Sequence, residues 1–411
     1  MTTCENMGGD YGKDPWDGQR SAAGDGNEAG DGLRRRDLLR RMAAVPLALA
    51  FPMTFTVANR TGAQPVAAVP GGGSDSPSLP PLPRLPLLEF QAADGSRRPV
   101  RRRSQWGQRR DSILEAFQEI AGRVPGEEKR CPLDARVVSE EDCGSFVRRD
   151  LTYQAEPGDG GRVPAYLLVP KSALSRRRRA PGALCLHQTH SAGRKVVVGL
   201  GKSPDDEYGV ELVRRGFVCL APGYPRLADY SPDIKGLGYE SGTMKAVWDN
   251  KRGLDLLESL PFVRRGRFLA IGHSLGGHNA IYTAALEPRV AVVVTSCAFD
   301  AYLHYMNGNL SGWIQDRYLP RFEAYRGRPA EIPFDFHELI ASLAPRAFFA
   351  NAPKGDGNFR WASVHAIEEA VRPVYRWWGA ADRLRIRYPE GGHRFSPDLR
   401  AEAYGFVERH L

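Results

Sequence analysis

Apolar and polar positions follow a regular plan from residue 146 to the end of the chain. Two β-type runs come first, over 146–154 and 163–170, and the turn-forming sequence Glu156-Pro-Gly-Asp-Gly-Gly separates them. Two strand patterns joined by such a turn predict an antiparallel pair.

Beyond this pair, short apolar runs alternate with longer helical patterns. Short strands that alternate with helices are typical of a mostly parallel sheet covered on both faces. We therefore predict an α/β fold with a sheet of about eight strands, in which the serine turn described below follows the fifth. The further strands are expected at 182–186, 217–221, 268–271, 291–296, 347–350 and 384–388, and the helices at 205–215, 243–260, 278–286, 364–378 and 398–410.

One segment, 299–343, interrupts this alternation and is rich in aromatic residues and proline. We expect it to form a lid or cap inserted before the penultimate strand. Its aromatic side chains could stack on a substrate or pack the cap onto the domain, and both alternatives stay open. They are Tyr302, Tyr305, Trp313 and Tyr318.

The first part of the chain has the features of an export signal. Residues 1–33 are rich in Gly, Asp and Asn without periodicity, which predicts disorder. Arg34-Arg-Arg-Asp-Leu-Leu-Arg then precedes the apolar run 42–58, a pattern typical of a twin-arginine signal. We assign 1–68 to a disordered leader and signal, and predict export to the periplasm or the medium.

A permanent membrane anchor is the alternative for this apolar run. The run contains Pro46 and Pro52 and is barely long enough to span a bilayer, which argues against an anchor in the mature protein. Cleavage is expected after Ala63 or after Ala68.

Two further regions separate the signal from the alternating pattern. Residues 69–88 are rich in Pro and Gly and are expected to form a linker. Residues 89–145 carry one amphipathic helical pattern, 112–121, and are expected to be an N-terminal extension packed on the main domain. That domain is predicted to span 146–411.

Composition and charge exclude few classes of protein. The hydrophobic content of 42% is normal for a soluble protein with a full core, and the formal net charge is +9. Arginines cluster at 97–103 and 176–179, but no aromatic residues interleave the second cluster. We interpret both clusters as solvated segments and expect no nucleic-acid partner.

The cysteines do not indicate a metal site. Cys131 and Cys143 could form a disulfide in the extension, whereas Cys185, Cys219 and Cys297 lie in apolar runs and are expected to be buried thiols.

The strongest chemical signal is a glycine-flanked serine. An apolar run ends at Ile271 and leads into Gly272-His-Ser274-Leu-Gly276, which a helical pattern follows. A serine at a sharp turn between strand and helix needs glycine two places before and after it, because a Cβ there would collide with neighbouring backbone. The turn also directs the first amides of the helix toward a developing oxyanion. We predict that Ser274 is a nucleophile.

A serine hydroxyl needs an imidazole as base and a carboxylate that orients the imidazole. In this type of sheet the acid and then the histidine follow the serine along the chain, each after a strand. His393 lies in a glycine-rich loop after the last predicted strand and is the predicted base. Asp356, between Gly355 and Gly357 after the penultimate strand, is the predicted acid.

Other residues compete for these roles. Asp300 follows the preceding strand, and Asp382 stands before the last strand, at the wrong end for an acid. His273 and His278 flank the serine too closely to reach its hydroxyl with good geometry, so we interpret them as packing residues.

The oxyanion hole is expected to combine two backbone amides, one from Leu275 and one from the loop after the third strand. Thr189 is the first candidate in that loop and Gln188 the second. His187 and His190 in the same loop resemble a metal pair, but no carboxylate stands at ligand spacing, so we predict no metal.

These motifs together carry a family resemblance. They are the His187-Gln188 loop, Gly272 to Gly277, Gly355-Asp356 and Gly392-His393-Arg-Phe395. On them, the span from about 146 to 411 resembles the dienelactone hydrolase-like and acetyl-xylan-esterase-like branch of the α/β-hydrolases. Dienelactone hydrolases proper use a cysteine nucleophile, so the serine here favours carboxylic esters over their lactone.

The resulting hypothesis is an exported serine esterase that forms an acyl-enzyme and needs no cofactor. Its substrate is expected to be a small-molecule or polysaccharide ester. A peptidase related to the prolyl oligopeptidases is one alternative, although the extension before residue 146 is short for the gating domain of such enzymes. A non-catalytic binding protein on a hydrolase scaffold is the other.

Overall fold

The computed structural model describes residues 79–175 and 179–411, which form one compact unit. The leader and signal assigned to residues 1–68 therefore lie outside the described residues. So does most of the basic cluster at 176–179.

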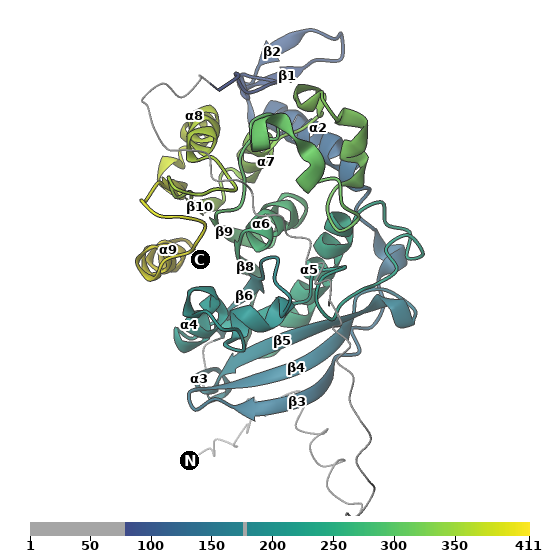
Figure 1. The fold of residues 1–411 in the computed structure, drawn as a ribbon, viewed down its shortest axis with the longest axis vertical. Coiled ribbons are helices and arrows are strands. Elements are labelled where there is room, and N and C mark those ends of the chain that lie inside the picture. Colours follow the sequence, from purple (N-terminus) through teal and green to yellow (C-terminus); the bar gives the residue numbers. More distant parts are fainter. Residues whose placement is uncertain (1–78, 176–178) are drawn as a thin grey trace, which may run out of the picture. The chain divides into compact units, whose positions relative to one another are not determined.

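A sheet of nine strands organises the described part (Figure 1). The strands run in the order β11-β10-β9-β8-β6-β7-β5-β4-β3, and those from β7 to β11 are all parallel. The predicted mostly parallel sheet is thus confirmed. The bounds are β3 (Arg136–Asp142), β4 (Phe146–Gln154), β5 (Arg162–Pro170), β6 (Ala180–Leu186), β7 (Val218–Pro222), β8 (Val263–His273), β9 (Val290–Ser296), β10 (Ala347–Asn351) and β11 (Leu384–Arg387).

The expected number of strands, about eight, was one too low. The additional strand, β3, pairs with β4 and forms an edge of the sheet, within the segment expected to be an extension. Its sequence is mostly charged, and all of its residues except Val137 are exposed. The charges explain the missed strand, because an edge that carries ion pairs such as Glu141–Arg148 shows no apolar alternation. The serine turn consequently follows the sixth strand of this sheet along the chain.

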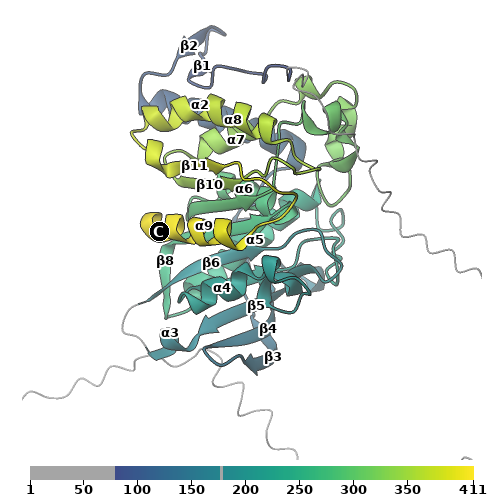
Figure 2. The ribbon, with the colours of Figure 1, turned by 60° about the vertical axis from the view of Figure 1, so that its left-hand side comes forward.

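Helices cover both faces of the sheet, as predicted (Figure 2). The helices α4 and α9 pack on one face, where they bury residues such as Tyr208 and Phe406 against Ile271 of β8. The helices α5 and α6 cover the opposite face. The bounds are α2 (Arg103–Ala121), α3 (Lys171–Ser175), α4 (Tyr208–Arg214), α5 (Gly242–Ser259), α6 (Leu275–Leu286), α7 (Phe336–Leu343), α8 (Trp361–Trp377) and α9 (Pro397–His410).

The N-terminal described segment packs on this domain. A short hairpin, β1 (Glu89–Gln91) with β2 (Arg97–Pro99), precedes α2, which begins nine residues before the predicted helix at 112–121. The Phe117 ring of α2 stacks on Tyr282 of α6 with 5.1 Å between centroids.

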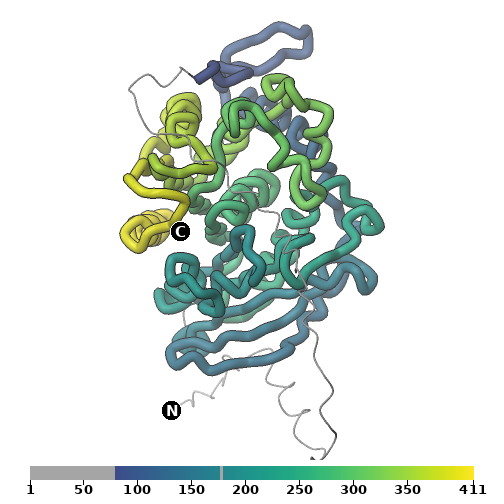
Figure 3. The backbone as a smooth tube through the Cα atoms, in the orientation of Figure 1, coloured from purple at the N-terminus to yellow at the C-terminus, as the bar shows by residue number. Residues whose placement is uncertain are grey.

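The segment 299–343 lies between β9 and β10, and Figure 3 follows its backbone, drawn in green. It consists of short 3-10 helices followed by α7. Part of the expected linker lies against it, because His304 and His337 each bond through Nε2 to a carbonyl, of Pro80 and Pro83 respectively. The 3-10 helices are η6 (Tyr305–Gly308), η7 (Leu310–Gly312), η8 (Pro320–Tyr325) and η9 (Pro329–Glu331).

The cysteines in the described ranges all carry free thiols. The disulfide considered between Cys131 and Cys143 is therefore wrong for this structure. The strand β3 separates the two residues, and seven extended residues span roughly 23 Å, far beyond the reach of a disulfide. Among the described helices, none is both long and apolar enough to cross a membrane.

Candidate active site

Ser274 occupies a strained turn between β8 and α6. Its backbone has φ 52° and ψ −122°, a conformation that costs a non-glycine residue free energy and persists only where the surroundings enforce it. The Ser274 amide donates to the carbonyl of Ser296 at the end of β9, at 2.8 Å. That bond ties the turn to the neighbouring strand.

Two glycines make this turn possible, as the sequence pattern predicts. A Cβ on Gly272 would overlap the backbone of Gly276, and a Cβ on Gly276 would overlap the carbonyl of Leu186 in β6. Both clashes are with backbone, which cannot rotate away. Neither position can therefore take a side chain without moving the sheet or the helix.

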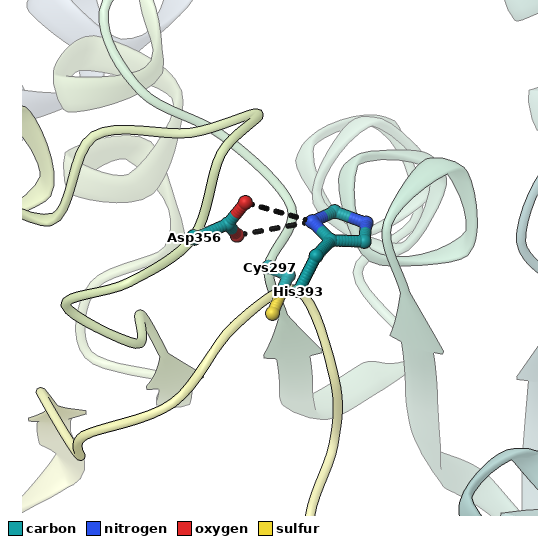
Figure 4. Close-up of side chains that lie close together, drawn as sticks. All are labelled: Cys297, Asp356 and His393. Carbon is teal, nitrogen blue, oxygen red and sulfur yellow. Dashed lines mark hydrogen bonds and ion pairs between the residues drawn. The ribbon is translucent and has the colours of Figure 1, made fainter. Parts of the chain in front are cut away.

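His393 and Asp356 lie together on adjacent loops (Figure 4). The Nδ1 of His393 is 2.9 Å from Oδ1 and 3.0 Å from Oδ2 of Asp356. The Asp356 side chain is 1% exposed, whereas that of His393 is 31% exposed. Since Nδ1 faces the carboxylate, Nε2 is the nitrogen left for a reacting hydroxyl.

The environment of Asp356 favours its charged form. Burial raises the pKa of this carboxyl. The hydrogen bond and charge of His393 and the amides of Asn358 and Phe359 together lower it by more than burial raises it, so the net pKa lies below the ordinary value. The two amides donate to Oδ1 at 2.8 and 3.2 Å. An ionised Asp356 can hold His393 in one tautomer.

The rival carboxylates have other surroundings. Asp300 is fully buried after β9, and burial raises its pKa well above the ordinary value. It accepts a bond from the amide of Arg360 at 3.2 Å and makes no hydrogen bond to His393. Asp382 is exposed in a short 3-10 helix before β11.

The predicted oxyanion amides lie near the serine. Leu275 is the first residue of α6, so its amide has no acceptor within the helix. Thr189, Ser274 and Leu275 line one cavity. The amides of Thr189 and Gln188 donate to no other residue in the described ranges, and of these two residues Thr189 lines the cavity.

The two histidines of that loop have structural partners. Buried His187 donates from Nδ1 to the carbonyl of Gln188 at 2.8 Å and accepts at Nε2 from the amide of Tyr224 at 3.1 Å. Burial lowers the pKa of His187 to about 4. His190 accepts the amide of Ala192 at Nδ1. His187 therefore has no ring nitrogen left for a metal.

The histidines that flank the serine pack around it. His273 lies with its ring 4.8 Å from that of His393, and burial and that neighbour lower its pKa to about 3. His278 donates from Nδ1 to the carbonyl of Ala298 at 3.1 Å and packs against Trp313 at 4.9 Å. Among the described residues, no histidine bonds to the Ser274 hydroxyl, His393 included; His393 differs from these two in its bond to the Asp356 carboxylate.

The cavity at Ser274 has a volume of about 190 Å³. Three of the four cap aromatic residues line it, while Tyr302 is fully buried within the cap. Tyr302 thus packs the cap, and Trp313 packs against it at 5.3 Å as well as lining the cavity. The three residues that line the cavity are Tyr305, Trp313 and Tyr318.

Two polar residues missed in the sequence connect the loops of the site. Buried Asn351, at the end of β10, donates from Nδ2 to Ser296 Oγ at 2.8 Å and to the carbonyl of Arg394 at 3.1 Å. Ser296 Oγ also lies 3.2 Å from Nδ1 of His273. This link joins the residue before the nucleophile to the residue after the base. In the sequence, the signal for these two residues was their position, because Ser296 and Asn351 are the polar residues that end the apolar strands β9 and β10.

Comparisons with known proteins agree with this architecture. Residues 199–407 match the model of the alpha/beta hydrolase family. A glucuronoyl esterase from Solibacter usitatus has a similar fold, with a TM-score of 0.64 and 18% identity over 82% of this chain and 98% of that chain.

Among curated proteins, a carbohydrate esterase from an unknown prokaryotic organism is 24% identical over 70% of this chain and 77% of its own length. The 4-O-methyl-glucuronoyl methylesterase 1 of Wolfiporia cocos is 24% identical over 44% of this chain and 48% of its own length. The relatives thus include carbohydrate esterases. With the family model covering half of its residues, this chain belongs to the alpha/beta hydrolase family.

Proposed function

We propose that this protein is a serine hydrolase that cleaves carbohydrate esters through an acyl-enzyme. The observation that carries the proposal is the His393–Asp356 pair, in which the His393 ring lies 4.8 Å from that of His273, the residue before the strained Ser274. The carbohydrate esterases among the relatives support the class of substrate.

Each residue has one role in the proposed reaction. Nε2 of His393 accepts the proton of Ser274 as Oγ attacks the ester carbonyl, and Asp356 orients the imidazole. The amides of Leu275 and Thr189, with Gln188 as the alternative, hold the oxyanion. His393 returns the proton to the leaving alcohol. The same histidine then activates the water that releases the acid.

The lining of the cavity is a second argument for a sugar next to the ester. Tyr305, Trp313 and Tyr318 line the same cavity as Ser274, and aromatic rings provide flat apolar surface for a sugar ring. Because several relatives are named for methylesters of 4-O-methyl-glucuronate, uronate esters are the first substrates to test, followed by acetylated sugars. No cofactor takes part in the proposed reaction.

Export is part of the proposal and rests on the twin-arginine pattern at residues 34–40. Changing Arg35 and Arg36 to Lys is expected to retain the protein in the cytoplasm. An unchanged distribution between cell fractions contradicts export by this route.

The decisive experiment compares wild type with Ser274→Ala. Wild type is expected to react with a fluorophosphonate probe and to hydrolyse uronate methyl esters, glucuronoyl esters, acetylated sugars or aryl acetates. Ser274→Ala is expected to lose both properties while its Tm and circular dichroism stay unchanged. Labelling or turnover that persists in this variant rules out Ser274, and cleavage of aminoacyl-proline anilides alone would favour the peptidase alternative.

A further inference from the structure

A second cavity, of about 130 Å³, lies at the opposite end of the parallel strands. Arg267 in the first part of β8, Arg346 just before β10 and Arg383 just before β11 all line it, together with His410 at the end of α9. Ser274 stands seven positions after Arg267, which corresponds to roughly 23 Å of extended chain. The cavity is therefore separate from the proposed active site.

In the described part of the chain no carboxylate is paired with the three arginines of this cavity, and the charge of Asp382 acts on His410. Among residues 79–175 and 179–411, none of the three forms an ion pair, and their bonds go to backbone carbonyls. The acidic neighbour of Arg346 is Glu287, whose carboxylate is held by Arg289 and Lys251.

The surroundings of Arg346 disfavour its positive charge. It donates to the carbonyls of Ala284, Glu287, Val290 and Leu343, so its guanidinium is fixed. Burial, and after it the charge of Arg110, lower the pKa of Arg346 to about 10. An anion in the cavity would lower the free energy of this charge.

The other two arginines retain capacity to bind. Arg267 donates one bond, to the carbonyl of His410 at 2.8 Å, and Arg383 donates one, to the carbonyl of Pro345 at 3.2 Å. A guanidinium carries five N–H groups in a planar fork that matches an oxyanion. Most donors of both residues are therefore free for a ligand.

We infer that this cavity binds a small oxyanion of the phosphate or sulfate type, held between Arg267, Arg346 and Arg383. The volume exceeds that of a few water molecules at about 30 Å³ each, so one tetrahedral anion fits. The anion could be free or carried on a sugar.

Binding is measured by calorimetry and by Tm on the full chain, with sodium sulfate, sodium phosphate or glucose 6-phosphate against sodium chloride at equal ionic strength. Wild type is expected to bind sulfate or phosphate by calorimetry. The double variant Arg267→Gln, Arg383→Gln is expected to bind the anion at least about tenfold more weakly, because each substitution removes a guanidinium that donates charge-assisted hydrogen bonds to it. The gain in Tm over chloride should be larger for wild type than for the double variant, because sulfate and phosphate also stabilise folded proteins without a site. Arg346 is left intact, since it holds four carbonyls.

The matched control removes the same charge elsewhere, from exposed Arg101 and Arg102, and is expected to bind like wild type. Binding of glucose 6-phosphate alone would identify a sugar-linked anion. Equal binding by wild type and the double variant, equal loss in the control, or no gain over chloride would each overturn the inference.

Discussion

At the scale of single residues, the site joins a buried carboxylate to a partly exposed imidazole. Asp356 accepts two backbone amides besides His393, so its orientation does not depend on the histidine. Its pKa lies below the ordinary value of 3.8. The ionised carboxylate therefore contributes its full stabilisation of the fold above pH 3.8, and this contribution is lost as the pH falls through the lowered pKa. Activity changes between pH 5 and 7 therefore do not report Asp356.

The exchange Asp356→Asn separates the two candidate acids. We expect kcat for an aryl acetate to fall about 10³- to 10⁴-fold, because an amide cannot hold the same tautomer of His393. Asp300→Asn is the matched control. Its side chain is buried, and its raised pKa favours the neutral acid, so the amide should retain kcat within about threefold. The reverse pattern would assign the acid to Asp300.

A second prediction at this scale concerns His278. Burial lowers its pKa from 6.5 to about 4, so between these values the unfolded chain binds a proton that the folded chain refuses. Its contribution to stability therefore falls as the pH drops from 6.5 toward 4. As the pH drops over this interval, the free energy of unfolding of His278→Gln should fall less steeply than that of wild type. The two slopes should differ by up to about 1.4 kcal/mol per pH unit.

Urea unfolding at several pH values between 4 and 7 measures this slope. His365→Gln, with a half-exposed side chain, is the control and should keep the slope of wild type. Identical slopes in all three proteins contradict the assignment of a buried neutral His278.

At the scale of elements, the ends of β9 and β10 set the distance between the nucleophile turn and the base loop. Ser296 Oγ receives Asn351 Nδ2, and Asn351 also holds the carbonyl next to His393. Ser296 and Asn351 are also register partners in the paired strands β9 and β10. The polar link therefore attaches the base loop to the end of a strand ladder.

Asn351→Ala should therefore act on turnover rather than on binding. We expect kcat to fall about 10- to 100-fold with KM within about twofold, because His393 shifts while the cap cavity stays intact. Thr295→Val, a buried polar exchange one residue before Ser296, is the control and should keep kcat. Equal losses in both variants would indicate general destabilisation instead.

The segment before α2 and the helix α2 itself each contribute one arginine that pairs with a single buried acid of the cap. Glu338 of α7 is 1% exposed and pairs with Arg84 and Arg109, each at 2.7 Å. Removing both arginines leaves an uncompensated buried charge, which should cost about 3 kcal/mol of unfolding free energy. The exposed pair Arg98–Asp94 offers a control, since Arg98→Ala should change stability by less than about 1 kcal/mol. Urea denaturation compares the two variants.

At the scale of the whole described unit, the two ends of the parallel strands carry different chemistry. Ser274, Asp356 and His393 all follow the carboxyl ends of strands, as expected for a sheet of this type. The amino ends hold an arginine-lined cavity. Ligand effects on Tm can therefore be assigned to one end or the other with the variants described above.

The sequence by itself determined the order of strands and helices and the serine turn, and it indicated the loops of Asp356 and His393. These features depend on local patterns: apolar periodicity, glycine beside a strained residue, and position after a strand. The tertiary structure decided what depends on distant partners. The strand β3 shows no apolar alternation, and its place is known only from its pairing with β4. Likewise the Asn351 link and the arginine cavity arise from residues far apart in the chain, because only folding brings their charges and hydrogen bonds together.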